Sequence, residues 1–258
     1  MSVWRETRVA ADRTHHVRAG VALYPARFLE VLSFHAPGLA AARDATGAFH
    51  IDVSGQPVYA RRFTRTFGFY EGRATVEQGR EAFHLREDGS ELSAERHAWC
   101  GNFQSGRCTV RDRDGRYFHV DREGHPVYAQ RHAYAGDFRD GLAVVQDAEG
   151  LHLHIHEDGR PLNGRRFLDL DVFHKGFARA RDERGWHHVD TAGEPIYGER
   201  FAMVEPFYNG QARVEREDGA LLILGEGGEI LHVLRPSLRV PGDPVSGAPV
   251  RRVGEGLS

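Results

Sequence analysis

A unit of 34–35 residues recurs at least six times along the chain, and each copy carries a histidine at an equivalent place. Self-similarity at a fixed period of this length is typical of repeat proteins, in which each unit buries its apolar face against its neighbours. The repeat therefore constrains the fold more than any other feature of the sequence. The six histidines are His15, His50, His84, His119, His154 and His188.

Each unit has two halves, and both have the period of β-strands. The first half reads F-x-x-G-x-A/C-x-A/V, which predicts a strand with a small side chain in a crowded position. The second half, best preserved in residues 49–63 and 118–132, predicts a strand, a glycine turn and a second strand. Neither half has the helical period, so we expect an all-β fold. An arginine closes every copy: Arg27, Arg62, Arg96, Arg131, Arg166 and Arg200.

The repeat resembles the WG repeat family, whose units read roughly G-x-W-G-Y-I-D-x-x-G-x-x-V followed by F-x-x-G-x-A-x-V. Residues 115–128 and 138–145 carry the likeness, which extends over about residues 14–233. The chain departs from the family at the name-giving pair, because only Trp186 remains and residues such as His119 stand where the family has tyrosine. The resemblance implies an interaction or binding repeat and indicates no particular activity.

The units alternate between two types, which gives a longer period of 69 residues. In type A units an aspartate follows the histidine two residues later, and the preceding strand ends in arginine. The type A residues are His50, His119 and His188 with Asp52, Asp121 and Asp190, and the arginines Arg43, Arg111 and Arg181. In type B units the strand ends instead in Glu77, Gln146 or Glu215.

This alternation predicts how the array closes. Residues 3–8 make a poor first half, and residues 221–232 make a poor second half with Ile223 in place of the histidine. Joining the well-formed halves, residues 207–215 and 15–28, completes one type B unit from both termini. We therefore expect a six-bladed β-propeller with pseudo-three-fold symmetry, with seven blades or an open β-solenoid as alternatives.

The repeat array is expected to be one domain, residues 1–239, followed by a flexible tail rich in Gly and Pro, residues 240–258. A net charge of −3 does not suit nucleic-acid binding, and no stretch approaches the apolar length of a membrane span. The N-terminus lacks the apolar run of a signal peptide, and Cys100 and Cys108 are expected to be buried free thiols. We therefore expect a cytoplasmic protein whose partner is a small molecule or a protein, with neither nucleic acid nor membrane.

Arginine alternates with glutamate or glutamine around the expected ring. One interpretation is structural, with each guanidinium facing the carboxylate or amide of the next unit. The other is a binding site, in which equivalent side chains converge near the ring axis and hold a small or anionic ligand. The residues of this candidate ligand site are Arg43, Arg111, Arg181, Glu77, Glu215, His50, His119 and His188.

The repeated histidines also allow two interpretations. A histidine on a strand in every unit is expected to bond a neighbouring Asp, Arg or backbone carbonyl and to lock one blade to the next. Alternatively, the three type A imidazoles would meet at the axis and supply a catalytic zinc site.

A separate, local candidate is the segment LHLHIH of residues 151–156, because alternate residues share one face of a strand and His-x-His chelates metals. Its ligands would be His152, His154 and His156, with zinc or another divalent transition metal as the cofactor.

Aromatic residues vary between units near the turn of the first half, where one rim of a propeller would carry them. They are Phe67, Tyr70, Trp99, Tyr134 and Tyr208. A residue repeated in every unit is usually structural rather than catalytic. We therefore expect a binding scaffold with a polar pocket lined by Arg, His and Glu. The alternative is a histidine-dependent, metal-dependent enzyme that acts on a small carboxylate-bearing molecule.

Overall fold

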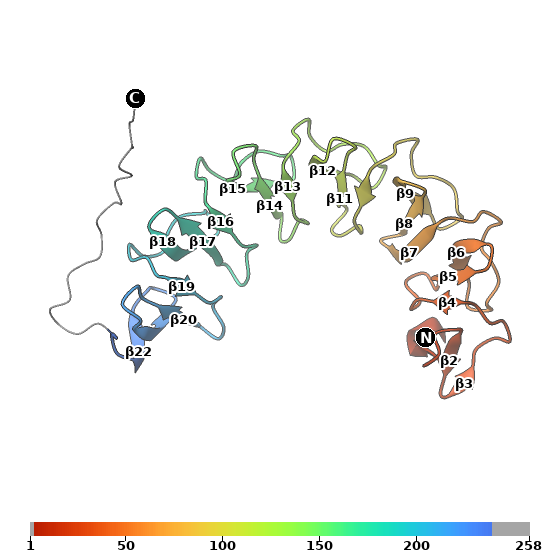
Figure 1. Cartoon of the computed structure of the whole chain (residues 1–258), viewed down its shortest axis with the longest axis horizontal. Coiled ribbons are helices and arrows are strands. Elements are labelled where there is room, and N and C mark those ends of the chain that lie inside the picture. The colour runs from red at the N-terminus through yellow and green to blue at the C-terminus, as the bar shows by residue number, and fades with distance from the viewer. Residues whose placement is uncertain (1–2, 239–258) are drawn as a thin grey trace, which may run out of the picture.

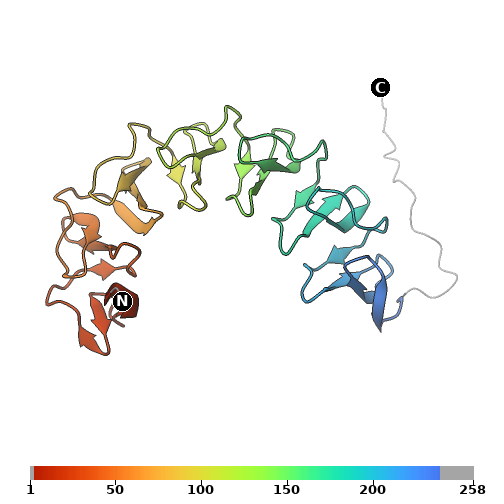
Figure 2. The same ribbon diagram turned by 180° about the vertical axis from the view of Figure 1, so that it is seen from behind.

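The structure is a computed structural model that describes residues 3–238, and it consists of seven small antiparallel β-sheets along an open arc (Figure 1). The first and last sheets lie at the two tips of the arc, and the view from behind shows the same gap between them (Figure 2). The expected all-β fold is confirmed: the one helix among the described residues is the 3-10 helix η1 (Val3–Glu6). In that part of the chain, therefore, no helix could cross a membrane.

The strands follow one another in chain order within each sheet, and we number the sheets 1 to 7. Sheet 1 contains β1 (Thr7–Val9), β2 (His16–Arg18) and β3 (Val21–Ala22). Sheet 2 contains β4 (Glu30–Val31), β5 (Ala40–Asp44) and β6 (Gly47–Ile51). Sheet 3 contains β7 (Arg65–Tyr70), β8 (Arg73–Gln78) and β9 (Glu81–Arg86). Sheets 4 and 5 contain β10 (Trp99–Cys100), β11 (Cys108–Arg111) and β12 (Tyr117–Val120); β13 (Tyr134–Ala135), β14 (Leu142–Gln146) and β15 (His152–His156). Sheets 6 and 7 contain β16 (Asp169–Leu170), β17 (Ala178–Asp182) and β18 (Gly185–Val189); β19 (Met203–Val204), β20 (Gln211–Glu215), β21 (Leu221–Gly225) and β22 (Ile230–Arg235).

The expected six-bladed ring, closed by one blade shared between both termini, is wrong. Sheet 1 is built from N-terminal residues alone, because β1 already pairs with β2 where a C-terminal strand was expected. Sheet 7 has four strands of its own, with β22 outermost. The described residues therefore form seven sheets, the number of the seven-blade alternative, in an open arc rather than a closed ring. The expected flexible tail, residues 240–258, lies outside the described residues.

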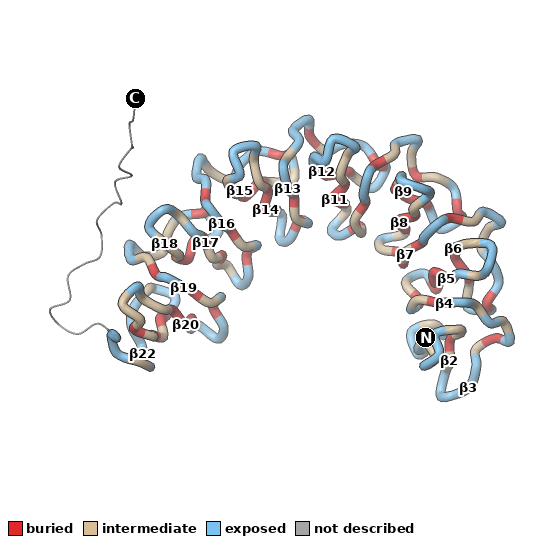
Figure 3. Tube along the Cα trace, viewed as in Figure 1, coloured by how far each residue is buried: buried red, intermediate tan, exposed pale blue. Residues whose placement is uncertain are grey.

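The small residue of the first half begins or nearly begins the middle strand of each of sheets 2 to 7, and it is buried in all six. Its exposed fraction does not exceed the 3% of Ala178. In Figure 3 the buried parts of the chain follow the strands, and the exposed parts follow the turns on both sides of the arc. The predicted crowded position is therefore confirmed. The six residues are Ala40, Ala74, Cys108, Ala143, Ala178 and Ala212.

A histidine joins each sheet to the next, and His119 shows how. It is fully buried, and its Nε2 lies 2.8 Å from the Gly136 carbonyl of sheet 5. Because a carbonyl can only accept, Nε2 carries the proton, and Nδ1 accepts from the Tyr128 hydroxyl at 2.5 Å. The ring also packs on Phe138 with 4.3 Å between centroids. The expectation that a repeated histidine locks one blade to the next is confirmed, and of the three kinds of partner left open the structure has the backbone carbonyl.

The same contact recurs at all six junctions, although its first member differs from the expectation. His16, and not His15, is the fully buried residue that bonds the Leu32 carbonyl at 2.8 Å. A spacing of 34 or 35 residues fits both histidines, so burial alone distinguishes them. The remaining pairs are His50 with Phe67, His84 with Gly101, His154 with Asp171, and His188 with Glu205.

The arginines and aspartates of the repeat hold turns within a unit. Arg62 places its guanidinium 3.7 Å from the centre of the Phe49 ring and donates from Nη1 to the carbonyls of the three preceding residues. The Asp52 carboxylate accepts from the backbone N–H groups of Ser54 and Gln56, at 2.8 and 3.0 Å. The aspartate of a type A unit therefore fixes the turn after the histidine rather than bonding the imidazole.

Candidate functional site

The structure does not bring the predicted ligand histidines together. His50, His119 and His188 are each fully buried in a different junction, and each bonds a carbonyl of the next sheet. Burial lowers the pKa of all three to about 4, so they are neutral at pH 7. The arc thus has no place for a three-histidine zinc site on an axis.

The three histidines of the local metal candidate on β15 also do not form one site, because the central one belongs to a junction between sheets. The central His154 is buried, lies 2.9 Å from the Asp171 carbonyl through Nε2 and stacks on Phe173. His152 and His156 stand half-buried at the two ends of the strand. Within residues 3–238, no three His, Cys, Asp or Glu side chains are grouped so that they could hold a metal ion.

The predicted arginines and glutamates occupy one row of positions at the end of the middle strand of each sheet. Arg43 lies opposite Glu30 of the first strand, with 4.0 Å between Arg43 Nε and Glu30 Oε2. Glu77 lies opposite Arg65, with 3.5 Å between Glu77 Oε2 and Arg65 Nη1. The expectation that these charges face the next unit is therefore wrong, because their partners are cross-strand neighbours in the same sheet.

The other charged members of the set also face residues of their own sheets. Arg111 lies over the Tyr117 ring at 5.7 Å, and Glu215 pairs with Arg235 at 2.9 Å. Arg181 stands opposite Asp169 in the strand register. The eight predicted ligand residues are therefore distributed along the arc, and they form no common site.

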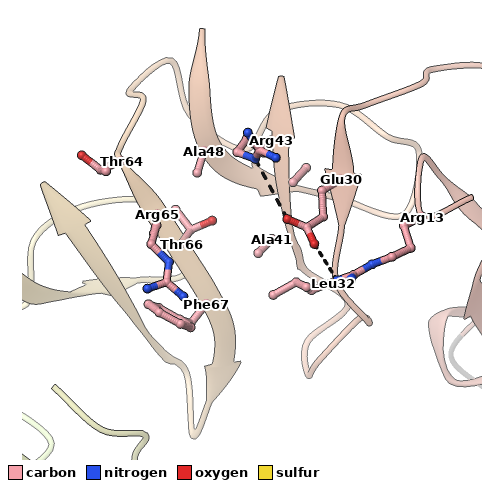
Figure 4. A pocket seen from close by; sticks show the side chains of 11 residues that line it. Arg13, Glu30, Leu32, Ala41, Arg43, Ala48, Thr64, Arg65, Thr66 and Phe67 are labelled. Atoms are coloured by element: carbon pink, nitrogen blue, oxygen red, sulfur yellow. Dashed lines mark ion pairs between the residues drawn. The ribbon is translucent and has the colours of Figure 1, made fainter. Parts of the chain in front are cut away.

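A pocket of about 510 Å³ opens between sheets 2 and 3 and extends to the loop before β2 (Figure 4). Four charged side chains line it, namely those of Arg13, Glu30, Arg43 and Arg65. The rest of the lining is mostly small or apolar and includes Leu32, Ala41, Ala48 and Phe67. Its volume lies in the range in which proteins bind small molecules.

The pocket has an excess of positive charge. Three guanidiniums line it with the carboxylate of Glu30, and Glu77 pairs with Arg65 outside the lining, so two carboxylates stand against three guanidiniums. Arg13 Nη2 lies 2.5 Å from Glu30 Oε1, and the Arg65 guanidinium lies 5.0 Å from the centre of the Phe67 ring. The side chains of Arg13, Arg43 and Arg65 are 60%, 51% and 63% exposed, so solvent screens their ion pairs and leaves the guanidiniums available to a ligand. Arginine forks suit carboxylate and phosphate oxygens.

The backbone holds Arg13 at the pocket in an unusual conformation. Its φ of 60° lies in the left-handed region, which costs a non-glycine residue about 1 kcal/mol or more. Two hydrogen bonds hold it there, one from the Arg13 N–H to the Ala10 carbonyl and one from the Val31 N–H to the Arg13 carbonyl, at 2.9 and 2.8 Å. The second bond ties the loop of sheet 1 to β4.

The pocket lies where a small residue replaces the large one of sheet 4. Ala48 lies opposite Arg43 in sheet 2, in the position that Tyr117 takes opposite Arg111 in sheet 4. The Tyr117 ring reaches Tyr134 of sheet 5, with 5.7 Å between centroids, and occupies the equivalent space.

Sequence reasoning found only Arg43 of the four charged residues at this pocket. Arg65 and Glu30 lie on first strands, and Arg13 lies in the loop between β1 and β2, outside the repeated motifs. The sequence did contain a signal for them. In sheet 2 the first strand carries the acid and the middle strand the arginine, as Glu30 and Arg43, whereas sheet 3 has the opposite order, as Arg65 and Glu77. The pairs can be recognised only once the strand register is known.

A second pocket, of about 800 Å³, lies among sheets 5, 6 and 7. It contains two of the variable aromatic residues, Tyr134 and Tyr208, which are 47% and 69% exposed. Three carboxylates and two arginines line it, so it lacks the positive excess of the first pocket.

The family model of the WG containing repeat matches residues 51–80, from the end of β6 to the turn before β9. This match confirms the resemblance to WG repeats. No curated protein matches the chain.

Solved structures resemble the chain loosely. BamB from Moraxella catarrhalis is 13% identical with a TM-score of 0.44, over 87% of this chain and 77% of that one. The computationally designed Ika8 protein is 12% identical with a TM-score of 0.42, over 88% and 82% of the two chains. The WD40 beta propeller domain of Doa1 is 14% identical with a TM-score of 0.33, over 78% and 80%. At these TM-scores the likeness carries no argument about function.

Proposed function

We propose that this WG repeat protein is a binding scaffold whose arginine-lined pocket takes a small molecule with a carboxylate or phosphate group. The observation that carries the proposal is the convergence of Arg13, Arg43 and Arg65 from three consecutive sheets on one pocket. Phe67 and the alanine wall would contact an apolar part of the same ligand.

The chemistry of the pocket favours binding over catalysis. Its described lining consists of arginine, glutamate, threonine and apolar side chains, with neither histidine nor cysteine. The repeat histidines, which the alternative enzyme would use, are bonded within the junctions. Three guanidiniums can hold and orient an anion without changing it.

The two cysteines bear on where the protein works. Cys100 and Cys108 are buried free thiols, and burial raises the pKa of both well above its ordinary value. Free thiols in one small sheet support a reducing compartment such as the cytoplasm, which we include in the proposal.

The test is calorimetric titration of the whole chain with inorganic phosphate, succinate and benzoate. We expect at least one of these anions to bind, and Arg43→Gln or Arg65→Gln to weaken binding roughly tenfold, a loss of about 1.4 kcal/mol. Arg113→Gln is the matched control, because Arg113 is 68% exposed and lies outside the pocket. Equal binding by the wild type and Arg43→Gln would contradict the proposal, as would the failure of all three anions to bind.

A further inference from the structure

In sheets 2 to 7, a glycine in the turn after the third strand is covered by the preceding sheet. A Cβ on Gly55 would lie 2.7 Å from the Tyr24 ring, and one on Gly159 would lie 2.6 Å from the Tyr128 ring. The missing side chain therefore lets the aromatic ring pack on the turn. The other covered turns are Gly89 beneath Tyr59, Gly124 beneath Leu92 and Ser93, Gly193 beneath Leu162 and Asn163, and Gly228 beneath Tyr197.

The equivalent turn of sheet 1 has no such cover among the described residues. Gly20 follows β2, the strand that carries His16 and corresponds to the third strand of the next sheets, and its φ of 78° is positive like that of the other turn glycines. It is exposed, and nothing described lies within 4 Å of a Cβ built on it. The adjacent Val21 is 70% exposed. At this tip of the arc, the glycine turn that a neighbouring sheet covers elsewhere is therefore left exposed.

The opposite tip presents a covering segment without a turn to cover. β22 comes directly after the Gly228 turn of sheet 7. In other sheets the chain after the corresponding turn carries the covering tyrosine, for example Tyr24 after Gly20 and Tyr128 after Gly124. Those two tyrosines are only 4% and 8% exposed, whereas Val233 and Leu234 on β22 are 60% and 55% exposed. A strand with several exposed apolar side chains is typical of an interaction surface.

The charges of the two tips are complementary. Residues 3–27 contain five arginines against two acidic residues, and residues 203–238 contain six acidic residues against three arginines. Each tip thus carries an excess of three charges, positive at sheet 1 and negative at sheet 7. Opposite potentials favour an encounter of these two surfaces and disfavour pairing of like tips.

We propose that a second copy of this chain docks head to tail, with β22 of one copy packed on the Gly20 turn and Val21 of the next. The contact continues the junction that already repeats six times within the chain, and it places the acidic tip against the basic one. Because the surface on one copy differs from the surface on the other, the association is heterologous and leads to a closed ring or a longer array.

The test begins with the mass of the full-length chain by light scattering and sedimentation at several protein and salt concentrations. We expect a species of two or more copies that dissociates on dilution and in high salt. Val21→Asp at the basic tip and Leu234→Asp at the acidic tip should each remove it. Val53→Asp is the matched control, since Val53 is 37% exposed but lies in the turn of an interior sheet.

Mixing the two variants sharpens the test. Each variant keeps one intact tip, so an equal mixture should form a heterodimer that neither variant forms alone. A chain that remains monomeric at every concentration would overturn the proposal. Loss of association in Leu234→Asp alone, with Val21→Asp unaffected, would also overturn it and indicate pairing of two β22 strands.

Discussion

The junction between sheets 2 and 3 and the junction between sheets 4 and 5 have the same scaffold and different contents. His50 and His119 make the same pair of hydrogen bonds, to a carbonyl of the next sheet and to a tyrosine hydroxyl. Beside them, the first junction has Ala48 and an open pocket, and the second has Tyr117 packed against a neighbouring tyrosine. The repeated residues therefore fix how sheets stack, and the variable position, Ala48 in one junction and Tyr117 in the other, distinguishes the contents of these two.

Acid should affect both junctions together and have the largest effect. Burial lowers the pKa of six histidines from 6.5 to about 4: His50, His84, His119, His154, His187 and His188. Between pH 6.5 and pH 4 the histidines of the unfolded chain bind protons that those of the folded chain do not. Their contribution to the free energy of unfolding is therefore fully present above about pH 6.5 and is lost as the pH falls. Each group contributes about 1.4 kcal/mol per pH unit, and six of them exceed a typical stability within about two units.

We therefore expect a single cooperative unfolding near pH 5, followed by circular dichroism and by tryptophan fluorescence. A chain that stays folded at pH 4 would show that the histidines are not desolvated as the structure has them. Two separate transitions would show that the two junctions differ in their scaffold as well as in their contents.

Removing the histidine should cost nearly the same in either junction. His50→Ala and His119→Ala each leave a buried carbonyl and a tyrosine hydroxyl without a partner and create a cavity, which should lower the free energy of unfolding by about 3 kcal/mol. Urea denaturation measures both losses. His15→Ala is the control, because His15 makes no bond to the next sheet, and it should change stability by less than about 0.5 kcal/mol. Unequal losses for His50 and His119 would contradict a common scaffold.

Tyr117→Ala should make the closed junction resemble the open one. The half-buried ring contacts Trp99, Tyr134 and Arg111, so its loss should lower the free energy of unfolding by about 1–2 kcal/mol. Tyr117→Phe keeps the ring and should cost under about 0.5 kcal/mol. A crystal structure of Tyr117→Ala should show a new pocket beside Arg111. If neighbouring side chains collapse into the space, Ala48 alone does not explain the open pocket.

Ala48→Tyr is the reverse change and should have the smallest effect on stability. The new ring enters an existing pocket rather than a packed core, so the free energy of unfolding should change by about 1 kcal/mol or less. Titration with whichever anion the wild type binds should show binding lost. Val53→Tyr, in an exposed turn outside the pocket, is the control. Unchanged binding by Ala48→Tyr would place the anion elsewhere.

The period of the sequence determined the strands, the tight turns and the crowded small residues, because each depends on neighbours within one unit. It also predicted that the repeated histidines join neighbouring units, since a residue needed in every unit serves a contact made in every junction, but it left the partner open among Asp, Arg and a backbone carbonyl. It misassigned the first of them, because His15 and His16 fit the period equally and only burial separates them.

The tertiary structure decided the open arc and the pocket. Closure depends on the angle between successive sheets, and small differences accumulate over seven sheets without leaving a mark in any one unit. The partner of Arg43, Glu30, lies on a first strand of only two residues, and the partner of Glu77, Arg65, begins a first strand of six, so the strands that carry them have no common pattern. Arg13 reaches the pocket only because a backbone bond folds its loop onto β4. The sequence therefore determined the features that lie within one unit and recur in each of them. Packing between sheets determined the pocket, which three sheets form together.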